Sequence, residues 1–146
     1  MIDKGAYDAI QAAGIFNNVG GKVDGFQMAG ILNLVQDTVT GFQGAGISNV
    51  AKSHVAGTQF SGIYSKANTV EGAQLAGIAN VAKGHVKGGQ WAAIFNKASS
   101  ISGLQLGLIN VVTDENTGSS FGLINISKGK NGRKRIGFIY RAPRKK

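Results

Sequence analysis

Residues 25–35 read GFQMAGILNLV, and variants of this stretch recur along the chain. Their shared pattern is G-x-Q-x-x-G-I-x-N-x-(A/V), with copies that begin at residues 9, 25, 41, 57, 72, 88, 103, 118 and 133. The copies form nine units of 15 or 16 residues, of which the last three are shortened or degenerate. A short fixed period of this kind is typical of solenoids, in which each repeat packs on its neighbours.

The regular residues of each unit fall at every second position, as Gln27, Ala29, Ile31, Asn33 and Val35 do. A period of two indicates a β-strand with one buried face. Glycines at the first and sixth positions suit sharp corners or a close approach of neighbouring backbones. The repeat therefore predicts an all-β protein, a β-solenoid whose narrow interior holds this set. We expect the interior to include Ile31, Ile47, Ile63, Ile78 and Ile94.

The sequence also has a longer period, because residues 49–55 (NVAKSHV) match residues 80–86 (NVAKGHV) at a distance of 31 residues. This period favours two repeats in each coil, with odd and even units in opposite sheets and with His54 and His85 as neighbours in adjacent coils. Stacked amides would then form hydrogen-bonded ladders. The expected ladders are Gln27, Gln59 and Gln90; Gln11, Gln43, Gln74 and Gln105; and Asn17, Asn49, Asn80 and Asn110.

The stretch GLQLGLIN at 103–110, with its variants GFQMAGILN and GAQLAGIAN, resembles the tandem GLQxGLIN-type units of bacterial surface-repeat proteins. The resemblance covers about residues 9–140 and implies a location at the cell surface or in an extracellular assembly. A weaker resemblance links Gln105, Gly107 and Asn110 to curli-type amyloid repeats, and we attribute it to shared ladder physics. Residues 1–8 lack the apolar stretch of a secretory signal, so a cytoplasmic location stays open.

Composition and charge divide the 146 residues into three parts. With 42% hydrophobic and 16% charged residues the chain should fold, and without cysteine it has neither disulfides nor thiolate sites. Seven lysines balance seven acidic residues in 1–127, so the net charge of +9 comes from the end of the chain. We expect a lead-in at 1–8, a repeat solenoid at 9–127 and a basic terminal rung and tail at 128–146. No stretch is long and apolar enough for a transmembrane helix.

The basic segment favours contact with a polyanion, which could be nucleic acid, lipopolysaccharide or anionic lipid. Its cations are Lys128, Lys130, Arg133, Lys134, Arg135, Arg141, Arg144, Lys145 and Lys146. Ile136, Phe138 and Tyr140 alternate as in a final strand, and the pair at 131–132, Asn-Gly, favours a tight turn. The segment could therefore instead cap the end of the solenoid.

Large side chains in alternate units have the parity opposite to the glutamines, so we expect them to point outward. They are Met28, Phe60, Tyr64, Trp91, Phe95 and Phe121. Contiguous exposed apolar side chains usually mark a partner surface, and the sequence favours an assembly interface here. A second core layer and a carbohydrate-stacking face are the alternatives.

Catalytic and metal-binding motifs are missing from the sequence. Only two histidines occur, no phosphate loop or Gly-x-Ser-x-Gly motif is found, and the adjacent acids Asp114 and Glu115 fall in an expected turn. We therefore expect no enzyme, cofactor or metal. The sequence predicts a nonenzymatic structural or interaction module that associates with itself, end to end or laterally, as an oligomer or filament. The alternative is a polyanion-binding module that acts through residues 128–146.

Overall fold

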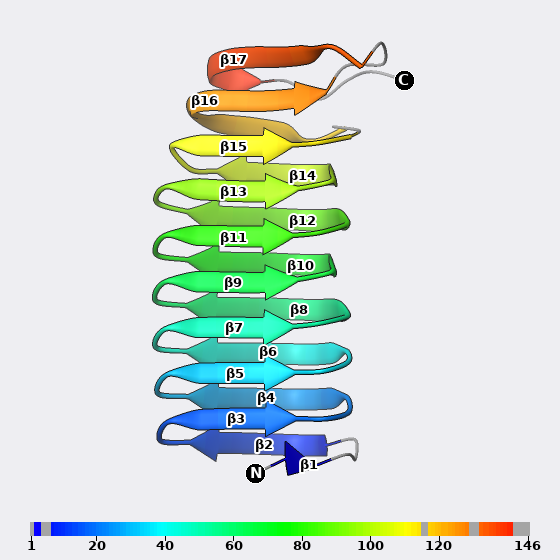
Figure 1. Ribbon diagram of the computed structural model, residues 1–146, viewed down its shortest axis with the longest axis vertical. Helices are drawn as coiled ribbons and strands as arrows, with labels where there is room; N and C mark the ends of the chain where they lie inside the picture. Colours follow the sequence, from blue (N-terminus) through cyan, green and yellow to red (C-terminus); the bar gives the residue numbers. More distant parts are fainter. Residues whose placement is uncertain (1, 4–6, 115–116, 129–131, 142–146) are drawn as a thin grey trace.

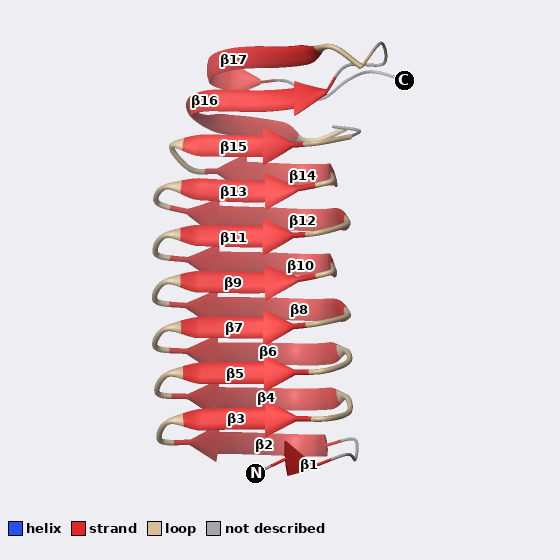
Figure 2. Cartoon of the chain, viewed as in Figure 1, coloured by secondary structure: helices blue, strands red, loops and turns tan. Residues whose placement is uncertain are grey.

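The computed structural model describes residues 2–3, 7–114, 117–128 and 132–141, and every regular element in these ranges is a β-strand (Figure 2). The described part contains no helix, and hence none that could cross a membrane. Long and short strands alternate along the chain, and each kind stacks into its own parallel ladder, one on each side of the molecule (Figure 1). The predicted β-solenoid is confirmed.

The strands have regular lengths. The long strands are β2 (Tyr7–Ala13), β4 (Val23–Ala29), β6 (Val39–Ala45), β8 (His54–Ser61), β10 (Thr69–Ala76), β12 (His85–Ala92) and β14 (Ser100–Leu106). The short strands are β3 (Phe16–Val19), β5 (Leu32–Val35), β7 (Ser48–Ala51), β9 (Tyr64–Ala67), β11 (Ala79–Ala82), β13 (Phe95–Ala98) and β15 (Ile109–Val112). The stack ends with β1 (Ile2–Asp3) beside β3, and with β16 (Ser119–Lys128) and β17 (Lys134–Arg141).

Each coil contains one repeat rather than two. Gln27 pairs with Gln43 in the next coil, and Gln43 pairs with Gln59, so the coil has 16 residues there. The coil from Gln59 to Gln74 has 15. The predicted 31-residue coil is therefore wrong, and with it the placement of odd and even units in opposite sheets.

The 31-residue period is instead a property of the outward-facing side chains. A Cβ atom added to Gly89 would lie 2.4 Å from Cη2 of Trp91, so the indole ring lies over Gly89 of its own strand. The ring of Phe42 lies in the same way beside Gly44, where an added Cβ would be 2.9 Å from Cε1. In the row that contains Trp91, the largest side chains alternate with smaller ones: Gly44 follows Met28, and Leu75 and Leu106 lie on either side of Trp91. The neighbouring row does not alternate, since Phe26 pairs with Phe42 in the next coil.

The two predicted glutamine ladders form one continuous ladder. Each glutamine from Gln27 to Gln105 donates from Nε2 to Oε1 of the glutamine one coil earlier, at 2.7–2.9 Å. The ladder begins at Gln11 and ends where Ser120 Oγ donates to Gln105 Oε1 at 3.2 Å. The side chains from Gln27 to Gln105 are completely buried, and this pairing offsets the cost of their desolvation.

The asparagine ladder runs with the opposite polarity. Asn17 Nδ2 donates to Asn33 Oδ1 in the following coil at 2.9 Å, and the pattern continues to Asn49 and again from Asn80 to Asn125. Ser65 interrupts it, because its hydroxyl bonds Ser61 Oγ at 2.8 Å. Asn80 Oδ1, one coil later, is buried without a hydrogen-bond partner. The asparagine ladder therefore has a defect at Ser65.

The isoleucines expected inside lie outside. Ile31, Ile47, Ile63, Ile78 and Ile94 are 42–45% exposed. The inward alternation stops where each long strand ends, for example at Ala29, and the following glycine and isoleucine form a corner. The alanines that precede the corners are buried as predicted. The aliphatic core lies at the other end of the cross-section and contains Val19, Val23, Val35, Val39, Ala51, Val55, Ala67, Val70, Ala82, Val86, Ala98, Ile101 and Val112.

Glycine is required at the first position of the repeat. Gly57 has φ of 135°, and a Cβ added there would lie 2.0 Å from the carbonyl oxygen of Gly41 in the preceding coil. The same conformation recurs at Gly41, Gly72, Gly88 and Gly103. Both backbone conformation and coil spacing therefore exclude a side chain at this row.

The C-terminal end is closed by a strand that reverses direction. β17 pairs with β16 in the antiparallel sense, from Lys128 opposite Lys134 to Ser120 opposite Arg141. The predicted final strand exists, but it is not a ninth parallel rung. Its Tyr140 ring packs on Phe121, with 4.6 Å between ring centroids.

Candidate interaction surfaces

The outward side chains form rows along the solenoid axis, and charge is segregated among them. The broad face consists of the outward residues of the long strands nearest the isoleucine corner: Met28, Phe60, Leu75, Trp91, Leu106 and Phe121. The isoleucine edge consists of Ile15, Ile31, Ile47, Ile63, Ile78, Ile94 and Leu108. The polar edge is the opposite corner, residues 36–38, 52–54, 68–69, 83–85 and 99–100.

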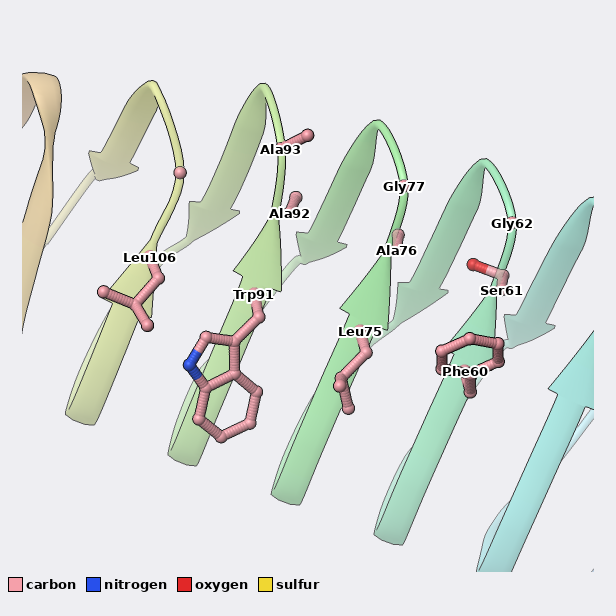
Figure 3. Close-up of a pocket in the computed structure, with 11 residues that line it drawn as sticks. Phe60, Ser61, Gly62, Leu75, Ala76, Gly77, Trp91, Ala92, Ala93 and Leu106 are labelled. Atoms are coloured by element: carbon pink, nitrogen blue, oxygen red, sulfur yellow. The ribbon is translucent and has the colours of Figure 1, made fainter.

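Four of the six residues predicted as an assembly interface lie on the broad face. Met28, Phe60 and Phe121 are 54%, 53% and 41% exposed, and Trp91 is half-buried. They point outward, as their parity predicts. The register places Leu75 between Phe60 and Trp91, and Leu106 next to Trp91, in one line. Figure 3 shows Phe60, Leu75, Trp91 and Leu106 projecting to the same side of adjacent long strands.

The other two predicted residues, Tyr64 and Phe95, belong to the opposite sheet. They begin the short strands β9 and β13 and are half-buried. Burial raises the pKa of the Tyr64 phenol above its usual value. The predicted interface is therefore divided between two faces that the isoleucine edge separates.

An open apolar groove runs beside the row of large side chains on the broad face. Its wall is Phe60, Leu75, Trp91 and Leu106, and its floor consists of small residues near the corner, among them Gly62 (Figure 3). It encloses about 590 Å³. The hydroxyl of Ser61 bonds inward to Ser65, and no charged side chain lines the groove. The groove therefore presents an apolar, uncharged surface.

Charged side chains of the coils lie away from the isoleucine edge and the broad face. Those with described side chains are Lys22, Asp24, Asp37, Lys52, Lys66, Glu71, Lys83, Lys87, Lys97 and Asp114. They occupy the polar edge, the equivalent corners that contain Lys22 and Asp114, and the strand positions next to them. Glu71 and Lys87 form an ion pair at 2.7 Å. The hydrogen bond with Lys87 lowers the pKa of Glu71 and raises that of Lys87, but both side chains are exposed, so the pair contributes little to stability.

The histidines of the polar edge bond hydroxyl groups and do not face each other. His54 Nδ1 lies 2.8 Å from Thr69 Oγ1, and His85 Nδ1 lies 2.7 Å from Ser100 Oγ. Because a coil holds one repeat, a whole coil separates the two histidines, and the expectation that they are neighbours in adjacent coils is wrong. Within the ranges that the structure describes, no three His, Cys, Asp or Glu side chains are grouped for a metal.

The structure places only some of the cations of the basic segment 128–146. Lys128 ends β16, and Arg133, Lys134 and Arg135 lie at the start of the capping strand, all with exposed side chains. Arg141 belongs to β17, but its side chain lies outside the described part. Lys130, Arg144, Lys145 and Lys146 also lie outside the described residues.

Sequence reasoning missed the isoleucine edge. Its signal was present, because glycine or alanine precedes each isoleucine at a position where a corner was expected. The chain turns at each corner, so the isoleucine there points outward. The period-two pattern of the preceding strand therefore cannot be extended past the corner.

Comparison of the chain with protein-family models, curated proteins and solved structures gives no match. The resemblance to bacterial surface-repeat proteins therefore depends on the GLQxGLIN-type units alone.

Proposed function

We propose that this protein is a nonenzymatic structural module that associates laterally with itself through the broad face, at a bacterial cell surface or in an extracellular assembly. The observation that carries the proposal is the line of exposed apolar residues from Met28 to Phe121, which contains no charged side chain. Aromatic residues and methionine are enriched at the centres of protein interfaces, where charged residues are depleted. The resemblance of the repeats supports the cell-surface location.

Lateral association is favoured over end-to-end stacking. In a stack, a second copy would pair with the strand edge at an end of the solenoid, and at the C-terminal end that edge belongs to β17. Exposed Lys134 and Arg135 in β17 would repel the same residues of a second copy if two C-terminal ends met. Basic residues on an edge strand are a common device against edge-to-edge growth.

The charge distribution also favours one orientation of the second copy. Asp24, Glu71 and Lys87 lie at the start of their long strands, near the polar edge, and the apolar row lies near the end. A two-fold axis perpendicular to the solenoid axis, in the plane of the interface, places apolar rows against each other in an antiparallel pair. With the two faces fully overlapping, a two-fold axis parallel to the solenoid axis would place these charges against apolar side chains.

Replacing Phe60 and Trp91 together with serine is expected to weaken self-association by at least about a hundredfold, because buried aromatic residues often contribute about 2 kcal/mol or more each to an interface. Sedimentation velocity over a concentration series measures the effect. Tyr64→Ser with Phe95→Ser is the matched control, since it removes two aromatic rings from the opposite sheet. A monomeric parent, or equal association by both double variants, would contradict the proposal.

The basic end supports polyanion binding as a second candidate function. Lys128, Arg133, Lys134 and Arg135 are exposed near one end of the solenoid, and Lys128 lies opposite Lys134 in the strand pair. Neutralising phosphates releases counterions, so such binding weakens steeply with salt.

Replacing Lys134 and Arg135 with glutamine should weaken binding to a short DNA duplex and reduce the salt slope by about 0.9 for each phosphate that is no longer neutralised. Fluorescence anisotropy at several salt concentrations measures both quantities. Lys52→Gln with Lys83→Gln controls for net charge. Substitution is preferable to truncation after Ser127, because truncation would remove the strand that covers β16. Equal losses of affinity in the two variants would show that net charge alone attracts DNA, and would count against this candidate.

A further inference from the structure

The isoleucine edge is an exposed apolar feature that self-association through the broad face does not cover. Ile31, Ile47, Ile63, Ile78 and Ile94 keep nearly the same exposure in five successive coils, and Ile15 and Leu108 extend the row. At about 4.8 Å per coil the row is a straight ridge of about 29 Å. We propose that this edge enters the hydrocarbon region of a lipid layer, with the polar edge in water.

The backbone N–H groups of the edge already donate hydrogen bonds within the solenoid. Ile47 N donates to Ile31 O at 3.1 Å, Ser48 N donates to the same oxygen at 2.9 Å, and Gly46 N donates to Ala29 O at 3.2 Å. Equivalent bonds join the corners from Ile31 to Ile94. Lipid offers no partner to an unpaired amide, so only backbone that bonds internally can enter it. Since these bonds run along the solenoid axis, the corner presents side chains to its surroundings.

Apolar residues flank the ridge on both sides. On one side lie the large side chains of the broad face, and on the other lie Leu32, Tyr64 and Phe95 at the starts of the short strands. The ridge and its two flanks together form a convex wedge. Tyr64, on the flank that the broad-face pairing leaves exposed, is a residue type that is enriched at membrane–water interfaces.

Charged residues begin only farther from the ridge. Lys66 and Lys97 follow two residues after Tyr64 and Phe95 on the short strands. Their long aliphatic stems can lie along an apolar surface while the ammonium group reaches lipid phosphate. On the short-strand side this order, from apolar ridge through aromatic flank to lysines, is that of an element lying in an anionic lipid interface.

The convex shape favours lipid over a second copy of the chain as occupant. Sheets pack on other sheets through their flat faces. A flat partner would touch an edge one residue wide along a line, whereas fluid hydrocarbon can surround both flanks. This proposal does not depend on the proposed self-association, and either can fail alone.

The test uses the full chain and vesicles of phosphatidylcholine containing phosphatidylglycerol, with binding measured by co-sedimentation. Replacing Ile63, Ile78 and Ile94 together with serine is expected to weaken binding by about a hundredfold, because each change removes part of an aliphatic side chain from hydrocarbon. The matched control replaces the same residues with valine, which keeps the edge apolar, and it should bind nearly as the parent does. Circular dichroism verifies that both variants stay folded, and sedimentation velocity follows self-association.

Loss of vesicle binding in the serine variant, with self-association unchanged, supports the proposal. A parent that does not bind vesicles, or a serine variant that binds as the parent does, overturns it. If the serine variant instead keeps vesicle binding and loses self-association, a second copy covers the edge and the proposal is wrong. Lys134→Gln with Arg135→Gln identifies binding through the basic end, which also overturns it if that change alone abolishes binding.

Discussion

Replacing Gly57 with alanine is expected to lower the free energy of unfolding by about 4 kcal/mol, the sum of backbone strain and overpacking. The residue has φ of 135°, a conformation that L side chains rarely adopt, and its Cβ would lie 2.0 Å from the carbonyl oxygen of Gly41. The oxygen belongs to the backbone of the preceding coil, so relief requires the two coils to separate. Since natural domains are stable by only about 5–15 kcal/mol, the urea midpoint should fall markedly.

Gly62→Ala is the matched control for this prediction. Its Cβ would lie 2.1 Å from the carbonyl oxygen of Gly46, a contact as close as that at Gly57, but without the positive φ. Ala93 occupies the equivalent corner of a later coil, so this position accommodates a methyl group. We expect a loss of only about 1–2 kcal/mol here. Equal losses at the two positions would show that crowding alone sets the cost, and no loss at Gly57 would refute the argument.

Replacing Gln59 with leucine is expected to destabilise the fold by about 4 kcal/mol, because two buried partners lose their hydrogen bonds at about 1–3 kcal/mol each. Gln59 Nε2 donates to Gln43 Oε1 at 2.7 Å, and Gln59 Oε1 accepts from Gln74 Nε2 at 2.9 Å. Leucine has a similar size, so the loss reports the amide pairing rather than a cavity. Urea unfolding followed by circular dichroism measures it.

The defect at Ser65 provides the reverse experiment. Ser65→Asn, together with Ser61→Ala to remove the hydroxyl that Ser65 now bonds, restores the repeat at both positions. The amide introduced at position 65 could then accept from Asn49 and donate to Asn80 Oδ1, which is now unpaired. We expect a gain of about 1–2 kcal/mol. A neutral result here, combined with a small loss for Gln59→Leu, would show that the ladders specify register without stabilising the fold.

Much of the fold could be predicted from parity and glycine spacing. The alternation that includes Gln27, Ala29, Asn33 and Val35 places these residues inside, because a strand has only two faces. Ile31 was misplaced because the strand ends before it and the chain turns a corner. Parity holds only within a strand, and the sequence marks corners less sharply than strands.

Coil length and the direction of the last strand could not be derived from the same pattern. The alternation of outward side chains, such as Leu75, Trp91 and Leu106 in three successive coils, imitates a longer structural repeat although the backbone repeats every coil. In β17 the segment with Ile136 and Phe138 resembles another repeat, yet it runs antiparallel. The two-residue turn signal before it was the better guide, because parallel strands need a longer connection than a tight turn.

The interaction surfaces were predictable only in part. Met28, Phe60, Trp91 and Phe121 share a parity, which determines that they face outward. The same parity assigned Tyr64 and Phe95 to them, because it does not record on which side of the corner a residue lies. Separating the two faces required the position of the corner within each coil.

The opposite polarity of the two amide ladders has an electrostatic consequence for the length of the molecule. Each glutamine side chain donates toward the N-terminal end of the stack, and each laddered asparagine donates toward the C-terminal end. Their dipole moments therefore oppose each other. In an α-helix the aligned peptide dipoles leave partial charges at the two ends. Here the two side-chain columns oppose each other, so a coil that adds one amide to each column adds little net side-chain dipole.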